Sequence, residues 1–214
     1  MNSAIEPIFY IAVLIFSVVI HEVSHGFAAL ALGDRTAKYA GRLTLNPIPH
    51  LDLFGSILLP ALLVFTQSPI LIGWAKPVPY NPYNLRNQRW GPAWVGAAGP
   101  LANISLALVF GLALRFLPST LGIISGSFLL NFMSIASSIV FTNLMLAVFN
   151  LVPIPPLDGS KVLFSVLPYQ WRGVEAFLEQ YGFMILLLFI FFFSRLLLPI
   201  VLILFRIIIG TFPF

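Results

Sequence analysis

Two histidines and a glutamate lie close together near the start of the chain, in the run from His21 to His25. On an α-helix, residues four apart lie on the same face, so both imidazoles can bind one metal ion. Glu22 then lies beside them and can activate a metal-bound water, as in enzymes where two His bind zinc and Glu is the general base. Zinc lowers the pKa of such a water to about 7. The alternative interpretation is an interhelical hydrogen-bond cluster or a proton relay.

A third metal ligand is needed, because a catalytic zinc ion normally has three protein ligands and one open position. The chain has no cysteine, which leaves His50 or a carboxylate. The best candidate is Asp158, which ends a segment that begins at Asn150 and contains three prolines. Irregular backbone of this kind is tolerated at membrane depth only inside protein or beside a wet cavity. The alternative for Asp158 is a simple helix cap, since the residues after Gly159 could begin a helix.

The composition indicates that these residues lie in a membrane protein. Hydrophobic residues make up 59% and charged residues 8% of the chain, and the mean hydropathy is +1.00. A soluble domain would be about one-quarter charged. No basic stripe or basic-aromatic patch is present, which argues against nucleic-acid binding. We expect one all-α polytopic membrane domain over residues 1–214.

Five apolar stretches reach the length of roughly 20 residues that is needed to cross a bilayer. They cover residues 8–32, 53–73, 93–117, 128–149 and 183–212. The first, third and fourth predict a three-helix catalytic core, and the last, which contains Arg195 and Pro199, predicts one or two C-terminal helices. Apolar and polar residues alternate before the second stretch, which predicts a short membrane-associated β strand or hairpin near residues 40–46.

The second stretch is expected not to cross the membrane. His25 and Asp158 both lie near C-terminal ends of spans, so an even number of crossings must separate them if they bind one metal ion. Three apolar stretches lie between them, and residues 53–73 are interrupted by Gly55 and Pro60. This stretch is therefore predicted to be re-entrant or interfacial.

The basic residues support this topology. With a re-entrant segment, eight of the eleven share one side of the membrane, Arg115 lies at the opposite surface, and Arg195 and Arg206 are not assigned to a side. The eight are Arg35, Lys38, Arg42, Lys76, Arg86, Arg89, Lys161 and Arg172. Because positive residues collect on the cytoplasmic side, we expect a cell-membrane protein with its N-terminus outside and its site toward the cytoplasm.

Three motifs together resemble the site-2 protease family. They are the run from His21 to His25, the segment from Asn150 to Gly159, and residues 98–103 (Ala-Gly-Pro-Leu-Ala-Asn), which match the middle core helix of that family. The likeness extends from the first span to about Ser165. The family's usual Asp-Gly-Gly is Asp-Gly-Ser at residues 158–160, which leaves the ligand itself intact. No stretch could form the PDZ or CBS domain of some relatives, so a compact form is expected.

The resemblance implies the roles of five residues. His21, His25 and Asp158 would hold one zinc ion, Glu22 would be the catalytic base, and Asn150 would help to hold the substrate strand or the oxyanion.

The expected function is a zinc-dependent intramembrane endopeptidase. It would hydrolyse peptide bonds in or near transmembrane segments of proteins that share its lipid bilayer. The alternative is a metal-ion or proton transporter that uses the same cluster, although no inverted repeat supports it. His50 and Asp52 form a further cluster of potential ligands, for which turn formation, gating and metal binding all stay open.

Overall fold

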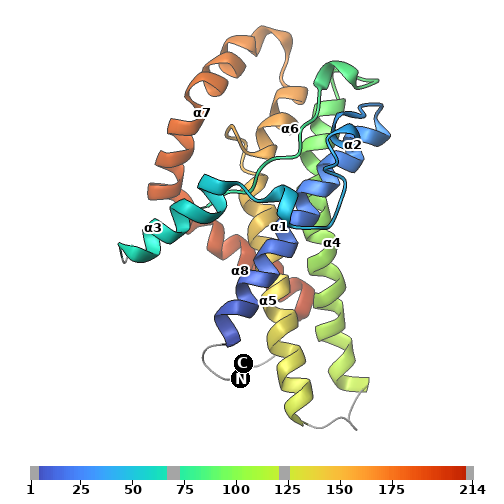
Figure 1. The fold of residues 1–214 in the computed structure, drawn as a ribbon, viewed down its shortest axis with the longest axis vertical. Helices are drawn as coiled ribbons and strands as arrows, with labels where there is room; N and C mark the ends of the chain where they lie inside the picture. The colour runs from blue at the N-terminus through green and yellow to red at the C-terminus, as the bar shows by residue number, and fades with distance from the viewer. Residues whose placement is uncertain (1–4, 67–72, 121–125, 211–214) are drawn as a thin grey trace.

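Three long helices form the centre of the molecule in the computed structural model, which describes residues 5–66, 73–120 and 126–210. They are α1 (Ile5–Ala31), α4 (Gly91–Thr120) and α5 (Gly126–Asn150). Helix α4 packs against both of the others, and all three run along the long axis of the molecule (Figure 1). They correspond to the three core spans expected at residues 8–32, 93–117 and 128–149, so that prediction is confirmed.

Small side chains let these helices approach closely, as is typical of helix packing in membranes. One buried cluster joins α4, α5 and the C-terminal helix α8 (Leu197–Ile209). Its members are Ala107, Leu114, Ala136, Val140, Leu144, Val201 and Ile209. Gly111 of α4 lies so close to Ile208 that a Cβ atom at this glycine would overlap that side chain.

Several short elements lie toward the end of the bundle where α1 ends and α4 begins, and α3 (Leu59–Phe65) extends from the side of the bundle at mid-height (Figure 1). The other short elements are α2 (Thr36–Tyr39), α6 (Asp158–Val166), a π-helix (Leu53–Leu58) and 3-10 helices at Ile48–His50, Pro82–Asn84 and Tyr169–Trp171. A long helix, α7 (Arg172–Phe193), starts at the same end, and the 3-10 turn Ser194–Leu196 joins it to α8. Helix α1 begins toward the opposite end (Figure 1).

Within the described residues, four segments are long and apolar enough to cross a membrane, which makes this a multi-pass membrane protein. They are Phe9–Ala31, Gly91–Phe116, Leu129–Asn150 and Tyr169–Ile209. The last segment contains both α7 and α8. These two helices together make a single passage along the molecule (Figure 1). At its far end, Arg115 Nη1 of α4 donates a hydrogen bond to Ile207 O at 3.3 Å.

The β strand expected near residues 40–46 is not formed, and that prediction is corrected. Gly41 has a left-handed backbone with φ 66°, and Arg42 N donates to Ala37 O, which closes a turn after α2. Further on, Thr44 Oγ1 accepts a hydrogen bond from Asn46 N. Turns and side chains therefore provide hydrogen-bond partners for the backbone of residues 40–46. A β strand would need a neighbouring strand for these bonds.

The stretch at residues 53–73 is not among the candidate spans of the described chain. It forms the π-helix and α3, and residues 67–72 lie outside the described part. Trp74 N donates to Gly55 O at 3.2 Å, and Ser56 Oγ donates to Trp74 O at 2.7 Å. The chain therefore comes back at Trp74 to the place where the stretch begins.

Candidate metal centre

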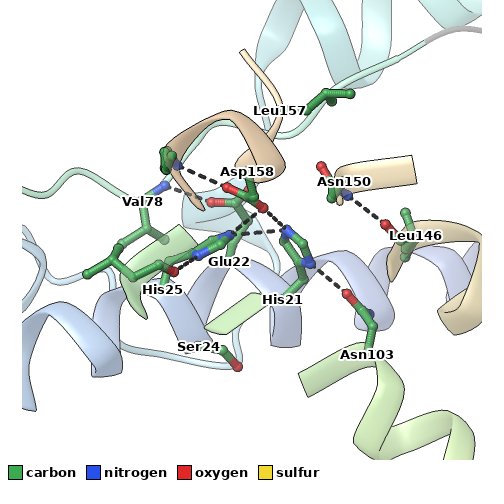
Figure 2. A network of polar contacts seen from close by, with 12 residues as sticks. His21, Glu22, Ser24, His25, Val78, Asn103, Leu146, Asn150, Leu157 and Asp158 are labelled. Carbon is green, nitrogen blue, oxygen red and sulfur yellow. Dashed lines mark hydrogen bonds and ion pairs between the residues drawn. The ribbon is translucent and has the colours of Figure 1, made fainter. Parts of the chain in front are cut away.

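Helices α1 and α6 bring three potential metal ligands together (Figure 2). His21 and His25 lie one turn apart on α1, and Asp158 is the first residue of α6. Asp158 Oδ2 lies 3.0 Å from His21 Nε2 and 3.1 Å from His25 Nε2. The two Nε2 atoms are 3.1 Å apart, and all three residues are buried. The structure thus joins the three residues that the sequence proposed as ligands.

A polar network across three helices orients His21. Its Nδ1 atom donates a hydrogen bond of 2.5 Å to Asn103 Oδ1 of α4. Asn103 Nδ2 in turn donates to Asn143 Oδ1 of α5 at 2.7 Å and to Ser17 O of α1 at 3.3 Å. These two acceptors determine which end of the Asn103 amide faces the imidazole. A neutral His21 therefore has its proton on Nδ1 and its free electron pair on Nε2.

The backbone of α4 orients His25 in the same way. His25 Nδ1 donates to Val95 O at 2.6 Å, so the free electron pair of a neutral ring also lies on Nε2. Gly99, one turn further along α4, faces both rings. A Cβ atom at Gly99 would lie 2.5 Å from His25 Nε2 and 2.6 Å from His21 Cε1, so only glycine fits here without displacing the imidazoles.

Lys161 holds the second oxygen of Asp158. Its Nζ atom donates to Asp158 Oδ1 at 2.9 Å, which leaves Oδ2 directed at the imidazoles. Burial alone would raise the pKa of the Asp158 carboxyl, but its contacts with His21, His25 and Lys161 hold that pKa well below its usual range. Burial would likewise lower the pKa of Lys161, and the Asp158 charge raises it instead. Both side chains are therefore charged at neutral pH.

The chemistry of this donor set fits a metal ion. Two imidazole nitrogens and one carboxylate oxygen lie within 4.8 Å of one another, and their electron pairs repel unless a cation lies between them. This combination suits zinc. Ligand atoms around tetrahedral zinc, with bonds of about 2.0–2.1 Å, are separated by roughly 3.3 Å, which is close to the distances found. The cluster could therefore bind a metal ion.

Glu22 is half-buried on α1 between the two histidines in sequence. Its Oε2 atom accepts a hydrogen bond of 2.9 Å from Val78 N (Figure 2). Val78 belongs to the segment from Trp74 to Pro79, which has no regular secondary structure. The carboxylate is thus bound to backbone that is far away in the sequence.

Asn150 is placed apart from the metal cluster, at the last residue of α5 (Figure 2). Its Nδ2 atom donates to Leu146 O at 2.9 Å, one turn back on the same helix. No described hydrogen bond joins Asn150 to His21, His25 or Asp158. Its role toward a substrate stays a prediction.

His50 and Asp52 stabilise turns. His50 is buried, and its Nε2 atom donates to Thr44 O at 2.9 Å. Asp52 Oδ1 accepts from Gly55 N at 2.7 Å, at the start of the π-helix. Neither residue belongs to the group of potential ligands in the described chain. The structural interpretation of this cluster is therefore favoured over direct metal binding.

Sequence reasoning overlooked Asn103, Asn143, Ser17 and Lys161 as partners of the cluster. One signal was available for the two asparagines, because a polar amide inside an apolar span is costly unless it has a partner. The partner itself follows only from how α1, α4 and α5 pack.

Comparison with known proteins agrees with this site. The sequence model of peptidase family M50 matches residues 119–193, a range that contains Asp158. No solved structure matches the chain significantly. Among curated proteins, YwhC of Bacillus subtilis is 38% identical over 84% of this chain and 78% of its own length. Rip2 of Mycolicibacterium smegmatis is 31% identical over 86% of this chain and 69% of its own.

A third relative, MJ0611 of Methanocaldococcus jannaschii, is 40% identical over 44% of each chain. The names of all three proteins describe them as candidate zinc metalloproteases. The helical fold, the cluster of potential metal ligands and the similarity to these relatives together define the class of protein. The chain belongs to peptidase family M50, the site-2 protease family.

Proposed function

We propose that this protein is a zinc-dependent intramembrane endopeptidase with one zinc ion per chain. The observation that carries the proposal is the meeting of Asp158, the first residue of α6, with His21 and His25, which lie inside a helix apolar enough to cross a membrane. Membership of family M50 and the zinc named for three relatives support the same metal.

In this mechanism His21, His25 and Asp158 hold the ion, and Glu22 is the catalytic base. Zinc, when bound, supplies a Lewis acid that activates water and polarises a carbonyl group. The Glu22 carboxylate takes a proton from the attacking water as its oxygen bonds to the carbonyl carbon of the substrate. Glu22 then gives this proton to the leaving amine, so the peptide C–N bond breaks and the base is restored. Asn150 would bind the substrate strand or the oxyanion.

The proposed substrates are transmembrane proteins in the same lipid bilayer. The cluster lies on and beside membrane-spanning helices, where a substrate helix can reach it laterally. Peptide bonds in a helix are shielded, so the substrate must be bound in an extended form, as an edge strand would be. The extended segment from Trp74 to Pro79 is a candidate surface for it.

The proposed orientation places the site toward the cytoplasm of the cell and the N-terminus outside. Helices α1 and α5 both end at the end of the bundle that carries α2 and α6. The eight basic residues identified in the sequence belong to the segments that begin or end there, which agrees with the positive-inside rule. The hydrogen bonds between Trp74 and residues 55–56 support a re-entrant path for residues 53–73.

The first test is cleavage by purified protein in liposomes that also contain a transmembrane substrate. We expect Glu22→Gln to reduce cleavage by at least about 10³-fold, because the amide cannot accept the proton of the water. Zinc content should stay near that of the wild type, because Glu22 is not a ligand. Persistent cleavage by Glu22→Gln would contradict the mechanism, and zinc transport without cleavage by the wild type would favour the transporter instead.

A further inference from the structure

In the segment from Trp74 to Pro79, alternate backbone N–H groups donate hydrogen bonds to other parts of the protein. Trp74 N donates to Gly55 O at 3.2 Å and Lys76 N to His50 O at 2.9 Å. Val78 N, the next donor in this alternating series, binds Glu22 Oε2 at 2.9 Å. In extended backbone, alternate residues point to the same side, so these three bonds form one continuous edge.

Val78 is flanked by Pro77 and Pro79, which have no backbone N–H. Both prolines also restrict their own φ, and each disfavours a helical conformation of the residue before it. The three residues 77–79 therefore offer a single N–H group in stiff, extended backbone. That group points at Glu22 (Figure 2).

Other contacts hold this donor in place independently of Glu22. Arg42 is buried, and its Nη2 atom donates to Lys76 O at 2.7 Å and to Pro77 O at 3.4 Å. The Val78 side chain is also buried and packs against α1, where a Cβ atom at Gly26 would lie 3.0 Å from Val78 Cγ1. The Arg42 hydrogen bonds and the packing of the Val78 side chain thus hold the Val78 N–H in place without a contribution from Glu22.

We propose that the Val78 N–H is a positioning group for Glu22. It holds Oε2 and leaves Oε1 to bind the attacking water. A free glutamate side chain has three rotatable torsions, and a misplacement of about 1 Å can cost roughly 100-fold in rate. This role rests on the proposed function, and it makes residues 74–79 a working part of the active site in addition to a surface loop.

The test compares proline at Val78 with proline at a position outside this segment. Val78→Pro removes the N–H and should lower kcat about 10- to 100-fold, with KM and zinc content near their wild-type values. Gly173→Pro is the control, because Gly173 lies in the first turn of α7, where proline is tolerated, and nothing lies within 4 Å of a Cβ atom there. It should keep kcat within about threefold of wild type. Val78→Ala keeps the N–H and should recover most of the activity that proline removes.

A kcat of Val78→Pro equal to that of Gly173→Pro, or higher than wild type, would overturn the proposal. The second result would mean that Val78 restrains Glu22 in an inactive position. If Val78→Pro does not fold, replacing Val78 by its α-hydroxy acid removes the same N–H with almost no change of shape. The same loss of kcat is expected.

A measurement without turnover completes the test. In protein labelled with 15N-valine, the Val78 amide proton should exchange more slowly in wild type than in Glu22→Ala, and equal rates would overturn the proposal. Glu22→Gln separates the two claims. If that variant still cleaves, the proposed function fails. If it is inactive while Val78→Pro is fully active, only the positioning role fails.

Discussion

Asn103 decides which nitrogen of His21 carries the proton, and it does so with a side chain that is fully buried between three helices. A metal ligand usually donates its other ring N–H to such a partner, and losing the partner costs affinity. Because Asn143 and Ser17 O occupy the amide hydrogens of Asn103, its oxygen cannot turn away from the imidazole. Asn103 is therefore part of the proposed metal site, although it is not one of the proposed ligands.

We expect Asn103→Leu to weaken zinc binding about 10- to 100-fold, measured by competition with a chelator of known affinity. The apolar side chain cannot accept the His21 Nδ1 proton, so the ring is free to rotate or to change tautomer. Ser105→Ala is the control on the same helix, because the exposed Ser105 hydroxyl bonds only within α4, to Leu101 O. Equal zinc affinities for Asn103→Leu and Ser105→Ala would contradict this account.

The residues of the cluster were predictable from sequence, but their partners were not. His21 and His25 follow from a local spacing, which a helix converts directly into a shared face. Asp158 required an argument about topology, since 137 positions separate it from His21. The roles of Asn103 and Lys161 depend on the exact approach of neighbouring helices, which no sequence period encodes.

At the scale of elements, α4 sets the depth at which the imidazoles lie. Gly99 allows α1 to approach until both imidazole rings almost touch the α4 backbone. Larger side chains at this position would push α1 and α4 apart, or turn the rings away from Asp158. The same close approach lets Val95 O reach His25.

Gly99→Ala should therefore lose zinc at chelator concentrations that the wild type withstands, with at least about a 10-fold drop in affinity. The added Cβ would overlap both imidazoles, and the protein can relieve this only by moving a ligand. Gly173→Ala is the matched control, because nothing lies within 4 Å of a Cβ atom on that α7 glycine. Unchanged zinc affinity in Gly99→Ala would show that the two helices are further apart than described.

Element prediction succeeded where long apolar runs determine the structure and failed where short-range contacts do. The three core spans match α1, α4 and α5, because about 20 apolar residues in a bilayer have few alternatives to a helix. The strand near residues 40–46 was wrong, because alternation alone does not supply a partner strand. There, Gly41 N and Arg42 N donate to carbonyl groups of α2, and the His50 side chain donates to Thr44 O.

At the scale of the whole molecule, the described chain makes four passages. Helices α1 and α5 run toward the end that carries α2 and α6, and α4 and the segment Tyr169–Ile209 run away from it (Figure 1). If residues 53–73 follow the proposed re-entrant path, only α4 and α5 cross the membrane between His25 and Asp158. Two crossings return the chain to the same side, so the two residues can meet. The absence of native cysteine allows each position to be tested with a single introduced thiol.

With a membrane-impermeant thiol reagent on intact cells, we expect cysteine at Tyr39 or Thr66 to stay unlabelled. Cysteine at Thr120, the last residue of α4, should be labelled. After the membrane is permeabilised, Tyr39→Cys should react, since Tyr39 is 77% exposed. Labelling of Thr66→Cys in intact cells would mean that residues 53–73 cross the membrane, which would separate His25 from Asp158.

The central claim is that His21, His25 and Asp158 bind one zinc ion, and zinc-edge X-ray absorption on purified protein tests it most directly. We predict about one zinc per chain with two imidazole nitrogens and a carboxylate oxygen at about 2.0–2.2 Å, and the oxygen contribution should weaken in Asp158→Ala. Wild-type protein that purifies without zinc and does not take it up would contradict the claim. A spectrum unchanged by Asp158→Ala would contradict it as well.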